Sequence, residues 1–129
     1  MNTKRILVVD DMIDVRRTAA GMLRDAGHSV EMCGSAAEAL SHLRKEYFDV
    51  VLLDIRLDDS DDQDISGLNL ATEISNLWPK TSIIILTAFA TVNMVEQALK
   101  PDRAGRQIAV SFLEKTDMGE LPRFIENLP

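Results

Sequence analysis

Two apolar segments of this 129-residue chain end in acidic residues, and these acids are the side chains whose types and spacing suggest chemistry. Residues 6–9 are followed by Asp10 and Asp11, and residues 50–53 are followed by Asp54. Three clustered carboxylates repel one another, and at neutral pH a divalent cation or proton uptake relieves that repulsion. Mg²⁺ suits the group because it takes a few carboxylates, keeps several waters and leaves room for a phosphate oxygen.

Two further apolar segments end in a hydroxyl and a cation. Residues 83–86 lead to Thr87, and residues 108–113 lead to Lys115. If all four segments are parallel strands, their carboxyl ends bring these groups to one rim, where Thr87 and Lys115 can bind phosphoryl oxygens. A carboxylate beside Mg²⁺ is then a nucleophile for phosphorus that forms an aspartyl phosphate. Asp54, at the centre of the sheet, is the candidate.

The elements that must position these groups alternate between strands and helices along the chain. This alternation predicts an α/β fold with a doubly wound parallel sheet and helices on both faces. Five strands in 129 residues match the flavodoxin-like form, whose strand order is 2-1-3-4-5. Ligands of such sheets bind at the carboxyl ends of the strands. The predicted strands are 5–9, 28–33, 49–54, 82–87 and 108–113, and the predicted helices are about 14–26, 35–47, 67–77, 91–99 and 117–127.

Local signals mark several helix ends. Gly27 suits the left-handed position that closes the first helix, and Ser35 with Glu38 forms a capping box for the second. The third helix stops before Pro79. Pro122 either shortens the last helix or lies in its first turn.

Composition excludes several classes of protein. A net charge of −7 and a pI near 4.7 argue against a surface that binds nucleic acid directly. The single cysteine, Cys33, rules out an internal disulfide and is typical of a reducing compartment. No signal peptide or apolar run long enough for a membrane span is visible, so the sequence predicts a cytoplasmic protein without a membrane partner. Cys33 and the methionines are expected in the core, and His28 and His42 are both expected to be helix-end and surface residues.

The acids and their neighbours resemble the receiver domain of two-component response regulators. The resemblance rests on the acidic pair at 10–11, the single acid at 54, Thr87-Ala88 and the run 112–115, Phe-Leu-Glu-Lys. It covers nearly the whole chain, so residues 1–129 are expected to form a single receiver domain with no output domain. Such a domain is a signalling phosphoacceptor rather than an enzyme.

The resemblance also implies a role for each site residue. Asp54 would accept a phosphoryl group from a histidine kinase or a histidine phosphotransfer protein. Thr87 and Lys115 would contact the phosphate, and Thr87 and Phe112 would act as the switch that changes the surface of the fourth helix, fifth strand and fifth helix. That surface would bind an unknown downstream protein or support a homodimer. The Mg²⁺ ligands would be Asp10, Asp11, Asp54 and the backbone carbonyl of Arg56.

Departures from the family pattern keep other functions open. Thr116 stands where the family usually has proline, and residues 58–64 form an unusually acidic loop. One alternative is a pseudo-receiver that binds proteins without being phosphorylated. Another is a Mg²⁺ phosphohydrolase, although the usual Asp-x-Asp motif is missing after the first strand. In the resembling family Arg56 and Phe89 would flank the attacking water, and their bulk is expected to slow loss of the phosphate.

Overall fold

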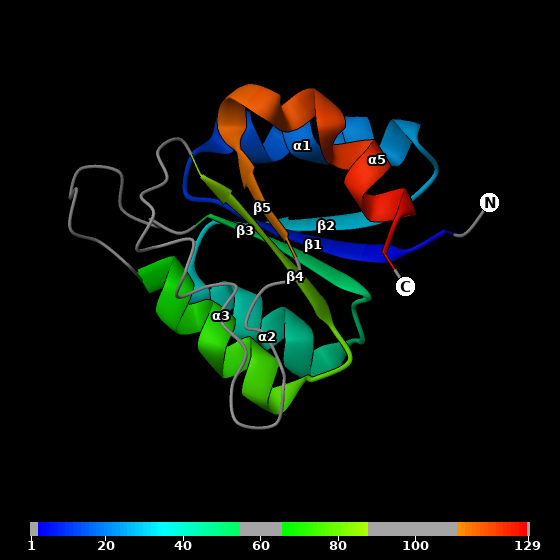
Figure 1. Ribbon diagram of the computed structural model, residues 1–129. Helices are drawn as coiled ribbons and strands as arrows, with labels where there is room; N and C mark the ends of the chain where they lie inside the picture. Colours follow the sequence, from blue (N-terminus) through cyan, green and yellow to red (C-terminus); the bar gives the residue numbers. More distant parts are fainter. Residues whose placement is uncertain (1–2, 55–65, 88–110, 129) are drawn as a thin grey trace.

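The computed structural model describes residues 3–54, 66–87 and 111–128, excluding the side chains at 66–68, 87, 111, 112, 115 and 116. Its centre is a five-stranded parallel sheet with the order β2-β1-β3-β4-β5 (Figure 1), as the sequence predicts. The strands are β1 (Arg5–Val9), β2 (Ser29–Cys33), β3 (Val50–Asp54), β4 (Ser82–Thr87) and β5 (Ser111–Glu114).

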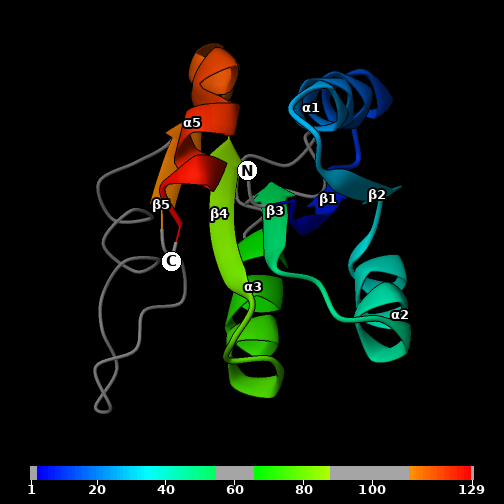
Figure 2. The same ribbon diagram turned by 90° about the vertical axis from the view of Figure 1, so that its right-hand side faces the viewer.

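Helices cover both faces of this sheet (Figures 1 and 2). One face carries α1 (Ile13–Asp25) and α5 (Leu121–Glu126), and the other carries α2 (Ala36–Lys45) and α3 (Ser66–Leu77). This is the doubly wound α/β arrangement that the alternation of segments predicts. The helix predicted over residues 91–99 lies outside the described residues.

The sheet separates the core into two halves because successive side chains of each strand point to opposite faces. All five residues of β3 are buried, as expected for a central parallel strand covered on both sides. One half packs against α2 and α3, and its strand residues are Leu7, Val9, Cys33, Val51, Leu53, Ile83 and Ile85. The other packs against α1 and α5, and its strand residues include Ile6, Val8, Val50, Leu52, Ile84 and Leu86.

Two predicted helix ends are confirmed. Gly27 adopts a φ of 97°, and the N–H of His28 donates a 3.1 Å hydrogen bond to the carbonyl of Leu23, which closes α1. At the start of α2 the Glu38 N–H donates to Ser35 Oγ at 3.2 Å. The Glu38 carboxylate accepts from the Gly34 N–H at 3.1 Å, one residue earlier than in the standard capping box.

The predicted last helix, 117–127, is wrong in its first part. Residues Lys115–Glu120 form a 3₁₀ helix, η1, and the α-helix begins only at Leu121. Pro122 lies in the first turn of α5, where its missing N–H costs no hydrogen bond. Met118, Leu121 and Phe124 recur every three residues, a spacing that suits both helical forms.

Two predictions of burial also need correction. His28 is only 8% exposed and its Nδ1 accepts a hydrogen bond from the Lys4 N–H, so it is not a surface residue. Met12 is 45% exposed rather than part of the core, whereas Cys33 is buried as expected. Within the described ranges no helix has the length and apolar character to cross a membrane, and no peptide bond there is cis.

Candidate metal and phosphoryl site

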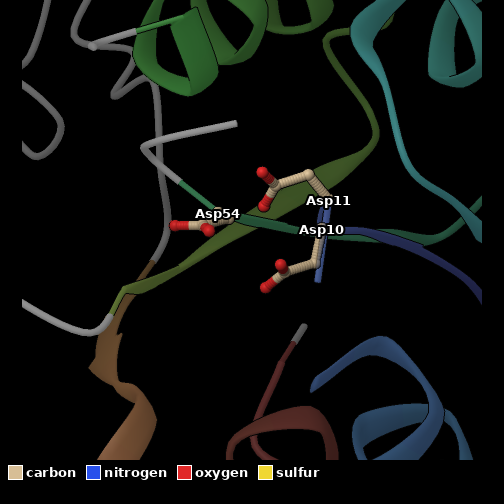
Figure 3. Close-up of side chains that lie close together, drawn as sticks. All are labelled: Asp10, Asp11 and Asp54. Atoms are coloured by element: carbon tan, nitrogen blue, oxygen red, sulfur yellow. The ribbon is translucent and has the colours of Figure 1, made fainter. Parts of the chain in front are cut away.

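The three predicted acids lie together at the carboxyl edge of the sheet. Each of Asp10, Asp11 and Asp54 offers a carboxylate oxygen, and these oxygens lie within 4.8 Å of one another. Figure 3 shows the three side chains gathered where β1 and β3 end. The cause is the register of two adjacent parallel strands: Val9 pairs with Leu53, so the residues that follow each of them emerge side by side.

The three acids differ in their exposure to solvent. Asp10 and Asp54 are each only 2% exposed, whereas Asp11 is more accessible to solvent. The N–H of Met12 donates a 2.9 Å hydrogen bond to Asp10 Oδ1, which fixes the side chain of this first acid.

This group of oxygens fits a hard divalent cation. Carboxylates are the ligands that Mg²⁺ and Ca²⁺ prefer, and a small set of them in one place leaves coordination positions for water or phosphate. Two of the three acids are buried, where mutual repulsion is least screened by solvent. A bound cation would offset that repulsion, so the residues present fit the Mg²⁺ that the sequence predicts.

The other predicted site residues can be placed only by their backbone or not at all. Thr87 is the last residue of β4 and follows Leu86, which pairs with Asp54. Lys115 directly follows β5, where it begins η1. Both are thus at the same edge of the sheet as the acids, but their side chains are among those not described. Arg56 and Phe89 lie outside the described residues.

A model of the response regulator receiver domain matches residues 6–123. The chain belongs to this family. Receiver domains are the phosphoacceptors of two-component signalling, they interact with histidine kinases, and they generally bind Mg²⁺ at an acidic cluster.

Relatives of this receiver domain include longer regulators. The transcriptional regulatory protein ZraR of Escherichia coli (strain K12) is 36% identical over 95 residues, which cover 74% of this chain and 20% of ZraR. The alginate biosynthesis transcriptional regulatory protein AlgB of Pseudomonas aeruginosa is 33% identical over 111 residues, which cover 86% of this chain and 22% of AlgB. The chain thus spans about a fifth of the length of the curated relatives it matches.

Solved structures of other receiver domains share the fold. A CheY-like receiver domain protein from Methanospirillum hungatei JF-1 has a TM-score of 0.79 and 28% identity, covering 97% of this chain and 92% of that one. The response regulator TrrA from Thermotoga maritima, in complex with Mg(2+)-BeF, has a TM-score of 0.75 and 28% identity, covering 98% of this chain and 100% of that one.

One contact near the acids of this receiver domain escaped the sequence analysis. Arg16, in the first turn of α1, turns its guanidinium back so that Nη1 donates to the carbonyl of Asp10 at 2.9 Å and to that of Asp11 at 3.4 Å. Helical periodicity indicates only which face of α1 is apolar. A polar residue that reaches back over the preceding loop has no such signature.

Proposed function

We propose that Asp54 is the phosphoacceptor and that it receives a phosphoryl group from a phosphohistidine of a histidine kinase or a histidine phosphotransfer protein. One observation carries the proposal: the Asp54 carboxylate ends the buried central strand and lies within 4.8 Å of the oxygens of two other carboxylates. In this reaction an Asp54 oxygen attacks phosphorus and the phosphorus–nitrogen bond breaks, with its electron pair going to the ring nitrogen. The imidazole leaves in its neutral form because its other ring nitrogen already carries a proton.

Asp10, Asp11 and Asp54, with the backbone carbonyl of Arg56, would hold the cation of this site. Bound Mg²⁺ supplies positive charge that offsets the negative charge on the phosphoryl oxygens. Asp10 contributes a fixed ligand, because its Oδ1 already accepts the Met12 N–H. Asp11 would be the more exposed of the ligands, and the phosphoryl donor would approach from its side.

Thr87 and Lys115 would bind the remaining phosphoryl oxygens, and Thr87 with Phe112 would form the switch. Support for these roles comes from the backbone: β4 and β5 are adjacent and end at the same edge as β3. The surface changed by the switch would include β5 and α5, with the helix predicted over 91–99. We propose that a downstream protein binds there and that the same surface can support a homodimer, without direct contact to nucleic acid.

The competing function is a pseudo-receiver that keeps the fold and binds proteins without being phosphorylated. Thr116 in place of proline and the acidic run at 58–64 favour it. Both functions use the same fold, so the test that distinguishes them is whether Asp54 is phosphorylated.

The experiment is intact-protein mass spectrometry after incubation with acetyl phosphate, with and without Mg²⁺. We expect one phosphoryl adduct on the wild type that requires Mg²⁺ and disappears in Asp54→Asn. Asp25→Asn, which changes an exposed acid at the far end of α1, is the matched control and should be labelled like the wild type. A folded wild type with no adduct and no beryllofluoride binding would instead identify the pseudo-receiver.

A further inference from the structure

The guanidinium of Arg16 lies between two loops of the carboxyl edge. Its Nη1 donates to the Asp10 carbonyl at 2.9 Å and to the Asp11 carbonyl at 3.4 Å, in the loop that leaves β1. Gly34, in the loop that leaves β2, lies next to the same nitrogen. The two loops are also joined directly, because the Asp10 N–H donates to the Cys33 carbonyl at 3.2 Å.

Gly34 provides the space that the guanidinium occupies. A Cβ added at this position would lie 2.9 Å from Arg16 Nη1 and 3.6 Å from its Cζ. The first distance is too short for a real contact, so any side chain at position 34 would push the guanidinium away. Gly34 is itself held by its N–H, which donates to the Glu38 carboxylate at 3.1 Å.

The two carbonyls bound by Arg16 belong to the residues that carry two of the three acids. A hydrogen bond to each carbonyl orients the following peptide plane, and it thereby restricts the direction in which the Asp10 and Asp11 side chains leave the backbone. Mg²⁺ demands near-ideal octahedral geometry at short distances, so its affinity depends on ligands that are already placed. Arg16 therefore acts on the geometry of the acids without contacting the ion.

We propose that Arg16 is a positioning residue for the cation site and that Gly34 is the glycine that admits its guanidinium. The proposal rests on the Mg²⁺ site of the proposed function and adds to it the contact that fixes the β1–α1 loop. The expected effect of removing Arg16 on Mg²⁺ affinity is opposite to the effect of its charge alone. Removing a positive charge near three carboxylates should strengthen cation binding by Coulomb's law, whereas loss of positioning should weaken it.

The test is a thermal-unfolding titration of the full chain with MgCl₂, which gives a Kd from the dependence of the melting temperature on Mg²⁺ concentration. Arg16→Gln should raise the Kd by roughly tenfold, the lower end of the effect of losing an outer-shell partner. Arg17→Gln is the matched control, because it removes the same charge from the exposed neighbour and should leave the Kd unchanged or lower it.

Gly34→Ala tests the contact without altering Arg16 or the net charge. It should raise the Kd in the wild type but add nothing in the Arg16→Gln background, because the contact is then already lost. Gly21→Ala is its control, since a Cβ there meets nothing within 4 Å. Arg16→Lys should recover part of the affinity, because an ammonium can still donate to one carbonyl.

The titration distinguishes failure of the cation site from failure of the positioning role of Arg16. A wild type whose melting temperature does not respond to Mg²⁺ would refute the cation site and with it the proposed function. A responsive wild type with unchanged Kd values in Arg16→Gln and Gly34→Ala would overturn the positioning role alone. A purely structural role predicts a lower melting temperature without Mg²⁺ and an unaltered Kd, and that result would also overturn it.

Discussion

The backbone N–H of Lys4 donates a 3.1 Å hydrogen bond to Nδ1 of His28, which joins the residue before β1 to the residue before β2. Burial lowers the pKa of His28, the charge of Lys4 lowers it further, and Glu126 acts in the opposite direction. The accepted hydrogen bond requires Nδ1 to be unprotonated. The imidazole is therefore held neutral by the fold.

This neutral histidine predicts a stability that falls in mild acid. As the pH drops through about 6.5, the unfolded chain takes up a proton at His28 that the folded chain resists. The stability from His28 is thus complete above that pH and is lost toward its lower folded pKa. We expect urea unfolding to show that the free energy of unfolding falls more between pH 7.5 and pH 5.5 in the wild type than in His28→Asn. Asparagine keeps a hydrogen-bond acceptor but does not titrate. Equal losses would refute the prediction.

Mg²⁺ should stabilise the folded protein by mass action. At a free concentration about 100 times the Kd, the free energy of unfolding should rise by about 2.7 kcal/mol, and a chelator should reverse the gain. Na⁺ at the same ionic strength, compared with Mg²⁺, separates specific binding from screening. If Na⁺ alone reproduces the whole shift, the acids do not form a cation site.

Asp11→Asn should change stability in opposite directions with and without the ion. Removing one of three clustered charges should raise the free energy of unfolding of the metal-free protein by up to about 1 kcal/mol, the size of a screened pair repulsion. The same change removes a ligand, so the gain from added Mg²⁺ should shrink. Paired denaturant titrations with EDTA and with Mg²⁺ measure both effects, and a variant less stable in both conditions would contradict the argument.

Ser35 should stabilise the folded protein by capping the N-terminus of α2. Ser35→Ala removes the acceptor of the Glu38 N–H and should lower the free energy of unfolding by about 1 kcal/mol. Ser41→Ala makes the same chemical change at an exposed position within α2, where alanine is the better helix former, and should be neutral or slightly stabilising. Denaturant unfolding of both variants measures the difference, and equal effects would exclude a capping role.

The thiol of Cys33 should be inert in the folded protein. Burial raises its pKa to about 12, and the nearby charge of Glu38 acts in the same direction. Only the thiolate is a good nucleophile, so Ellman's reagent at pH 8 should label the native protein at the rate of unfolding and the urea-unfolded protein at once. Labelling of the native protein as fast as of the unfolded one would show that the thiol is accessible.

Much of the fold could be predicted because its strands carry strong local signals. β1 and β4 begin and end at the predicted residues, since each is an uninterrupted apolar run that ends next to or at a polar side chain. The sequence also predicts that Asp10, Asp11 and Asp54 lie together, because parallel strands share a carboxyl edge.

The features that could not be predicted depend on tertiary contacts, which no local sequence pattern indicates. His28 follows a helix-ending glycine, where a histidine is commonly exposed, but the segment before β1 covers it. The end of the chain changes from η1 to α5 with little change in apolar spacing. Arg16, in α1, and Gly34, in the loop after β2, are 18 positions apart in the sequence, so neither residue alone could indicate their contact.

The alternation of side chains along β1 and β3 links the stability of the core to the survival of the site. Val8 and Leu52 face α1 and α5, and Asp10 and Asp54 lie two positions further along the same strands. Slippage of either strand by one residue would send its apolar side chains to the opposite face. The same slippage would pull the two carboxylates out of alignment. A misregistered chain thus loses the specific side-chain packing on both faces of the sheet together with its acid cluster, so a well-packed core and an intact site depend on the same register.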